Sequence, residues 1–179
     1  MSYCHSMACR TAGIQPTHPV RWRSLDGVMS VHWQAEGRAG ATGYYLSPDP
    51  RFVLFADDVS DHIEMSNTRP GPPGERRPMM RAIYVPAGQP LWTRFSRAHR
   101  FAHLDLHVHA DRLLRYLAPA IGASAAQAAM RRPVERPDAG AVGVLAGLLC
   151  DEIARPARHG AFAESLVGAI ATGMLDLSA

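Results

Sequence analysis

The chain has 179 residues, a formal net charge of +3, 47% hydrophobic residues and 20% charged residues. This length predicts one domain with a buried core, and the composition is that of an ordinary globular protein. The charge is too small to argue for nucleic-acid binding, and the apolar run 139–150 is too short to span a membrane.

The cysteine count and the N-terminal sequence bear on the cellular compartment of the protein. The 3 cysteines are an odd number and predict no disulfide framework. The N-terminal MSYCHSMACR lacks the basic-then-apolar order of a signal peptide. We therefore expect a cytoplasmic protein that does not associate with membranes.

The first part of the chain has the pattern of short strands. Residues 1–26 are polar and predict an N-terminal arm or a first edge strand. Turn signals at 37–40 and a Pro/Gly-rich loop at 67–78 separate the later strands from one another. About seven strands are predicted, which favours an antiparallel barrel or sandwich. The predicted strands are 27–35, 42–46, 51–56, 60–66, 82–85, 91–96 and 101–108.

From residue 110 the periodicity becomes helical. The pattern predicts helices from 111 to just before Pro119, over 123–130, from an N-cap at Asp138 to 154, and over 161–177. The fold class is therefore α+β, and the last two helices form an antiparallel hairpin.

The small residues of this hairpin allow two interpretations, close packing within one chain or a dimer interface. We expect a homodimer. The apolar residues predicted to form its interface are Leu113, Leu117, Leu145, Leu149, Phe162, Leu166 and Ile170.

Three short motifs carry a family resemblance. Val-Pro-Ala-Gly at 85–88 follows a strand, Phe-Ala-His-Leu-Asp-Leu at 101–106 precedes a helix, and Ala-Glu-Ser-Leu at 163–166 lies in the last helix. In this order they resemble the N-terminal effector-binding and dimerisation domain of AraC/XylS-type transcription regulators of bacteria.

The resemblance implies a cupin-like β-barrel of about seven or eight strands at 27–109 and a helical dimerisation subdomain at 110–179. It further implies a ligand-sensing domain for a small-molecule effector, with no catalysis and no cofactor of its own. In the family two helix-turn-helix units follow this domain. DNA contact is expected only through such a domain, which this sequence lacks.

Alternation on the strand 101–108 places His103, Asp105 and His107 on one face. Imidazole and carboxylate can bind transition metals, but neighbours two apart lie ~6.6 Å apart along a strand, so only two could share one ion. A polar face that lines a pocket or meets solvent is the favoured interpretation, and the sequence does not say whether it points inward. The alternative function is a stand-alone cupin metalloenzyme using His62, His103 and His107.

The cupin metal motifs are incomplete. Pro86 and Gly88 are present, but Leu91 stands where the second motif has its histidine. The chain also lacks a nucleophile elbow, a phosphate-binding glycine loop and a CxxC pair. We therefore expect a protein that is not an enzyme and has no metal site.

Aromatic residues on the predicted barrel strands suggest a small-molecule pocket, since such pockets combine aromatic walls with a few polar groups. The predicted ligand-binding residues are Trp33, Tyr44, Phe55, Tyr84, Trp92, Phe95, His103 and Asp105.

Overall fold

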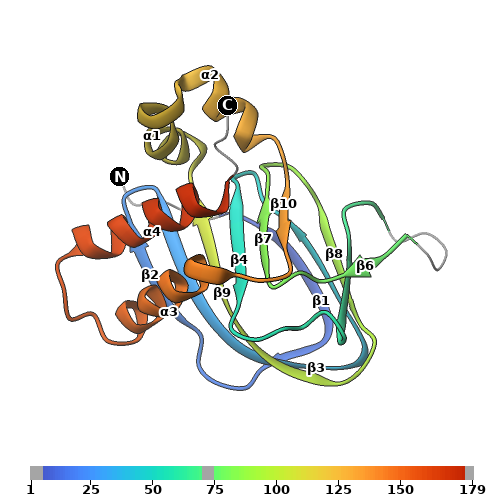
Figure 1. Ribbon diagram of the computed structural model, residues 1–179. Helices are drawn as coiled ribbons and strands as arrows, with labels where there is room; N and C mark the ends of the chain where they lie inside the picture. Colours follow the sequence, from blue (N-terminus) through green and yellow to red (C-terminus); the bar gives the residue numbers. More distant parts are fainter. Residues whose placement is uncertain (1–5, 70–74, 176–179) are drawn as a thin grey trace.

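A computed structural model describes residues 6–69 and 75–175 of the chain. In this part, one antiparallel sheet and four helices form an α+β structure (Figure 1). The strands are β1 (Ala8–Pro16), β2 (Arg21–Leu25), β3 (Val28–Leu46), β4 (Arg51–Phe55), β5 (Ile63–Ser66), β6 (Arg77–Pro78), β7 (Ala82–Val85), β8 (Leu91–Phe95), β9 (His99–Val108) and β10 (Val134–Arg136). The helices are α1 (Ala110–Ile121), α2 (Ala123–Met130), α3 (Gly140–Ala154) and α4 (Gly160–Met174).

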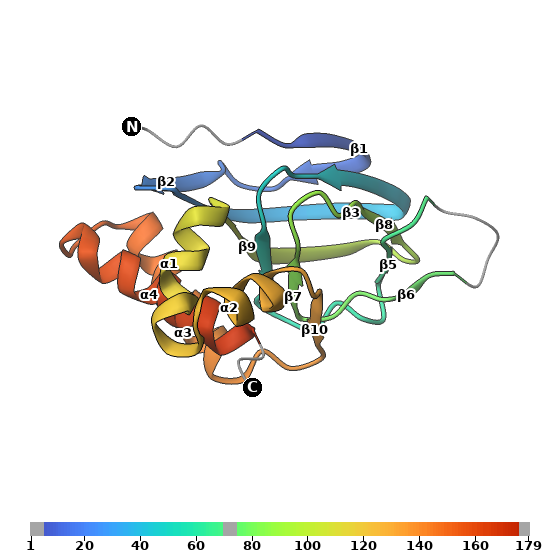
Figure 2. The same ribbon diagram turned by 90° about the horizontal axis from the view of Figure 1, so that it is seen from above.

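The sheet is antiparallel and curled into a half-barrel, which is compatible with the predicted barrel, while its cupin-like form stays a prediction. Eight strands follow the order β10-β7-β4-β9-β3-β8-β5-β6, and β1 and β2 both pair with β3 outside this path. The described part of the predicted arm, residues 6–26, therefore forms two strands, β1 and β2, where the sequence predicted an arm or one edge strand. Figure 2 shows β1 on the side of the sheet away from the helices. The short strands β6 and β10 were not predicted. Arg77–Pro78 lies at the end of the segment predicted to be a loop, and Val134–Arg136 is flanked by Pro133 and Pro137.

The predicted turn at 37–40 is wrong, because β3 runs through it as one strand. The register with β1 shifts there: Ala12 pairs with Thr42, but Ile14 pairs with Gly37. Gly13 and Gly40 take positive φ angles of 75° and 79°, a backbone conformation that glycine adopts without a steric penalty. The glycines that suggested a turn instead form an irregularity that bends a continuous strand.

The helices agree with the pattern except at their ends. α1 includes Pro119, which was predicted to lie beyond it. Asp138 Oδ1 accepts a hydrogen bond from the Gly140 backbone N–H, as expected of a capping side chain, although Ala139 is the N-cap residue. α4 ends at Met174, before the predicted end at 177, which lies outside the described residues. Within the described part, no helix is long and apolar enough to cross a membrane.

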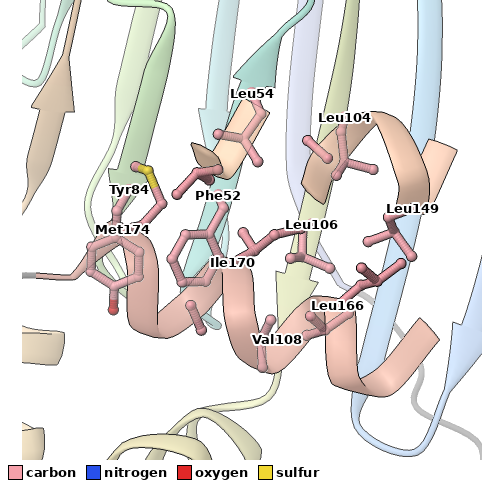
Figure 3. Close-up of a cluster of buried hydrophobic side chains, with 14 of the residues drawn as sticks. Phe52, Leu54, Tyr84, Leu104, Leu106, Val108, Leu149, Leu166, Ile170 and Met174 are labelled. Carbon is pink, nitrogen blue, oxygen red and sulfur yellow. The ribbon is translucent and has the colours of Figure 1, made fainter. Parts of the chain in front are cut away.

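Two apolar layers lie on opposite faces of the same strands. On β4, Phe52 and Leu54 point toward the helices, while Val53 and Phe55 belong to the core inside the half-barrel. Leu104, Leu106 and Val108 of β9 also belong to the helix-side core (Figure 3). Because side chains alternate along a strand, every residue of β4 and β7 is buried on one face or the other.

The residues predicted to form a dimer interface lie in the core between the helices and the sheet. Leu113, Leu117, Leu149, Leu166 and Ile170 are buried in the core of the single chain, four of them completely. Leu145 and Phe162 are partly buried and pack against the same core. Close packing within one chain therefore accounts for these side chains, and a homodimer stays a prediction that would have to use other surfaces.

The glycines of the helical hairpin also meet neighbours within the chain. A Cβ at Gly173 would lie 2.9 Å from Val142 Cγ2, and one at Gly168 would lie 3.1 Å from the Tyr116 ring. Both distances are shorter than ordinary carbon–carbon contacts. The small residues thus allow α4 to approach α1 and α3.

Replacement of Ile170 by Ala should lower the free energy of unfolding by about 2–5 kcal/mol, since it opens a cavity between α4 and the sheet. The matched control Val144→Ala, at a side chain 67% exposed on α3, should change it by less than about 0.5 kcal/mol. Denaturant titration at two protein concentrations measures both effects. A loss that grows on dilution would show instead that Ile170 lies in an interface between copies of the chain.

Candidate site: a cavity inside the half-barrel

The inner face of the sheet lines a partly open cavity of about 180 Å³. Its walls come from β1, β3, β4, β8 and β9, together with Met7, Ile63 and Met79. The strand residues that line it are Cys9, Thr11, Ile14, Pro16, Trp33, Ala35, Tyr45, Arg51, Val53, Phe55, Leu91, Thr93, Phe95, Phe101, His103 and Asp105.

The edge strand β1 supplies one wall. Cys9 and Thr11 line the cavity at odd positions, whereas Ile14 and Pro16 line it at even positions. Side chains alternate along a strand, so this change of parity needs one extra residue. The register shift between Ala12 and Ile14, with Gly13 at positive φ, provides it. The irregularity in β1 thus directs both of its halves into the cavity.

An aromatic wall surrounds the ring of His103. Register places His103 opposite Trp33 on β3 and opposite Phe55 on β4. Its ring centroid lies 6.4 Å from that of Trp33, at 8° between planes, and 5.6 Å from that of Phe101. Burial lowers the pKa of His103 to about 4, an effect that the negative charge of Asp105 only partly offsets. The ring is therefore neutral at physiological pH.

Phe95 completes this wall through a close approach to β3. Its ring centroid lies 5.6 Å from that of Phe101. A Cβ on Gly37 would overlap the Phe95 ring, so a residue with a side chain at position 37 would displace it. Glycine at position 37 therefore leaves the space that the Phe95 ring needs in the cavity wall.

The other end of the cavity holds a buried ion pair. Arg51 Nη2 lies 3.2 Å from Asp105 Oδ2, and both side chains are less than a tenth exposed. His107 Nε2 lies 3.4 Å from the same carboxylate oxygen. Burial alone would raise the pKa of Asp105, but Arg51 and then His107 outweigh it, and the pKa lies well below its ordinary value. The Asp105 carboxyl group is therefore ionised in the folded protein, and its charge is paired with that of Arg51.

Uncharged polar groups surround the ion pair. The Arg51 guanidinium carbon lies 5.3 Å from the centroid of the Tyr45 ring, and its Nη1 donates to Met7 Sδ at 3.1 Å. Burial raises the pKa of Tyr45 to about 12 and also raises the pKa of the Cys9 thiol. These groups keep their protons at neutral pH.

The structure brings five of the eight predicted ligand-binding residues together on the cavity wall: Trp33, Phe55, Phe95, His103 and Asp105. The face of β9 with His103, Asp105 and His107 therefore points inward, which the sequence left open.

The other three do not line this cavity. Tyr44 and Trp92 pack against each other on the outer face of the sheet, with ring centroids 4.3 Å apart. Tyr84 points to the helices and donates its hydroxyl hydrogen bond to the Met130 carbonyl at 2.9 Å. Alternation along the strands explains the difference. The inward-facing residues of β3, β7 and β8 have odd numbers, whereas Tyr44, Tyr84 and Trp92 have even numbers and therefore point to the other face.

The most important residue missed is Arg51. A signal was present: it stands two residues before Val53 on an otherwise apolar strand, so it shares that inward face. Register places Arg51 opposite His107 and Val53 opposite Asp105. The guanidinium and the carboxylate are therefore diagonal neighbours on adjacent strands. Sequence alone does not supply this register.

The three histidines of the alternative metalloenzyme are not brought together as a ligand set. The His62 ring stacks on that of His99 with centroids 3.9 Å apart, while His103 lies in the aromatic wall and His107 contacts Asp105. In residues 6–69 and 75–175, no group of three or more His, Cys, Asp or Glu could hold a metal ion.

Comparison of the sequence with models of known protein families gives no match, and comparison with curated proteins gives none either.

The neutral His103 makes stability depend on pH. Its folded pKa, about 4, lies below the ordinary value of 6.5, so between these values the unfolded chain binds a proton that the folded chain does not. The free energy of unfolding should therefore fall as pH drops from 6.5 to 4. A contribution of about 2–3 kcal/mol is expected, since a tenfold difference in proton affinity is worth about 1.4 kcal/mol.

His103→Phe, which keeps a ring in the wall, should flatten this part of the pH profile. Urea titration of both proteins across the range is the measurement. Parallel profiles for the two would contradict the assignment of a buried neutral His103.

Proposed function

We propose that this chain is a small-molecule-sensing domain, of the effector-binding kind that AraC/XylS-type transcription regulators carry. The observation that supports it best is the cavity inside the half-barrel, which combines an aromatic wall with one buried polar end. Small-molecule sites have this composition: mostly apolar walls with few placed polar groups.

The chemistry of the lining favours binding over catalysis. A catalytic acid or base works best when its pKa lies near the working pH. Here the pKa of Asp105 lies well below its ordinary value, and the pKa values of Cys9 and Tyr45 lie above theirs. His103 is neutral and lies in an aromatic wall. These groups can position and desolvate a ligand without exchanging protons with it.

A sensing domain must also change when its ligand binds, and β1 is suited to that change. In the described residues it pairs with β3 alone, and most of its residues are exposed. Its side chains still form one wall of the cavity. A ligand that contacts them binds the paired arrangement of β1 more tightly and shifts the population toward it. In our proposal this shift is the signal passed to an attached DNA-binding domain and to a partner subunit.

Filling the cavity should abolish binding. A fragment library of small ring compounds, screened by thermal shift, should contain members that raise the Tm and change the tryptophan fluorescence of the protein. Ala35 is 4% exposed on the inner face of β3, so Ala35→Phe places a ring in the cavity and should remove these responses. Ala141→Phe, on the exposed face of α3, is the matched control and should keep them.

A screen in which no compound raises the Tm would contradict the sensing function. So would a screen in which Ala35→Phe and the parent protein respond alike.

A further inference from the structure

We infer that the cavity takes an uncharged, single-ring compound bearing one polar group that both donates and accepts hydrogen bonds. This inference rests on the proposed function and adds the chemical class of the ligand. Three observations carry it: the size of the cavity, its aromatic wall, and the internal neutralisation of its charged end.

Size limits the ligand to about one ring. The cavity has a volume of about 180 Å³. An apolar cavity of about 150 Å³ holds benzene. The available space therefore fits one six-membered ring with a small substituent.

The wall determines that the body of the ligand is a ring. The centroids of the Phe55 and Phe101 rings lie 5.4 Å and 5.6 Å from that of the neutral His103 ring. The Phe95 ring extends the cluster, with its centroid 5.6 Å from that of Phe101. Aromatic pairs prefer offset or edge-to-face contacts at such distances, and each adds about 0.5–1.5 kcal/mol beyond the burial of its area. A planar ligand ring can add to this cluster at the same spacing.

The charged end determines that the ligand is neutral. Of the described side chains that line the cavity, only Arg51 and Asp105 are charged at neutral pH, and they pair with each other. An anionic ligand would have to compete with Asp105 for Arg51 and would meet a like charge. A cationic ligand would meet Arg51 in the same way. Burying a charge without a partner is costly, so both are disfavoured.

The same end of the cavity favours a ligand group that both donates and accepts hydrogen bonds. Among the described residues, Arg51 Nε has no hydrogen-bond acceptor and Asp105 Oδ1 has no donor, although both atoms are buried. A buried donor or acceptor without a partner costs about 1–3 kcal/mol. A primary amide or similar group carries an acceptor for the arginine and a donor for the carboxylate. A small movement of the two side chains on binding would let both atoms reach it.

Three probes of nearly equal shape separate the possibilities: benzamide is neutral, benzoate is an anion and benzamidinium is a cation. Calorimetry and tryptophan fluorescence on the full chain at neutral pH should show benzamide binding more tightly than either ion by about tenfold or more. Either ion binding as tightly as benzamide overturns the inference while leaving the sensing function intact. If none of the three binds at millimolar concentration, the ligand class is wrong, and the fragment screen then decides separately whether the cavity binds anything.

Removal of the Asp105 charge tests whether the ligand is neutral because Asp105 neutralises Arg51. Asp105→Asn leaves Arg51 without its counter-charge, so benzoate should bind this variant about tenfold or more tighter than it binds the parent protein, and benzamidinium should not gain. Asp61→Asn removes an exposed carboxyl group outside the cavity and should leave the order of the probes unchanged. Unchanged benzoate affinity in a folded Asp105→Asn protein contradicts the inference. If circular dichroism shows that this variant does not fold, the order of the three probes on the parent protein decides.

Discussion

The structure depends on strands that are covered on both faces. β4 and β7 have no solvent-facing side, because the helices cover one face and the half-barrel interior covers the other. Val53 of β4 and Ile83 of β7 each have both chain neighbours fixed in the helix–sheet core. On β4, Val53 lies in the inner layer between Phe52 and Leu54 of the outer layer. The cavity walls formed by these strands are thus held from behind.

The buried ion pair fits this constraint. In general a buried salt bridge adds little net stability, because desolvation offsets the attraction between the charges. Its effect on register is different. A slip of β4 by one residue would turn Arg51 toward the helices, away from Asp105, and would bury an unpaired charge in an apolar layer. The pair therefore penalises the wrong register and holds β4 and β9 in the arrangement that forms the cavity.

Alternation and turn chemistry made part of this structure predictable. They indicated the α+β class, the polar row His103, Asp105 and His107, and the helices to within a few residues. They did not indicate the direction of a face, because alternation separates two sets of side chains without saying which set lies inside. For that reason Tyr84 was grouped with Phe55, although the two point to opposite sides of the sheet. The partnership of Arg51 with Asp105 depends on strands that are far apart in sequence, and only the folded sheet brings them together.

The two sides of the cavity differ in how firmly they are supported, and this bears on any response to a ligand. Behind β4 and β9 lie buried residues of α3 and α4, so a displacement of that wall would disturb a packed core. No such layer supports β1, which pairs with β3 only and is mostly exposed in the part of the chain that the structure describes. The sulfur of Met7, the residue before β1, nevertheless accepts a hydrogen bond from Arg51, so the charged end contacts the segment that leads into β1. A ligand that changes the environment of Arg51 therefore acts first on the segment that costs least to move. Under the proposed function, the order or displacement of β1 would be the change that an attached domain or a partner detects.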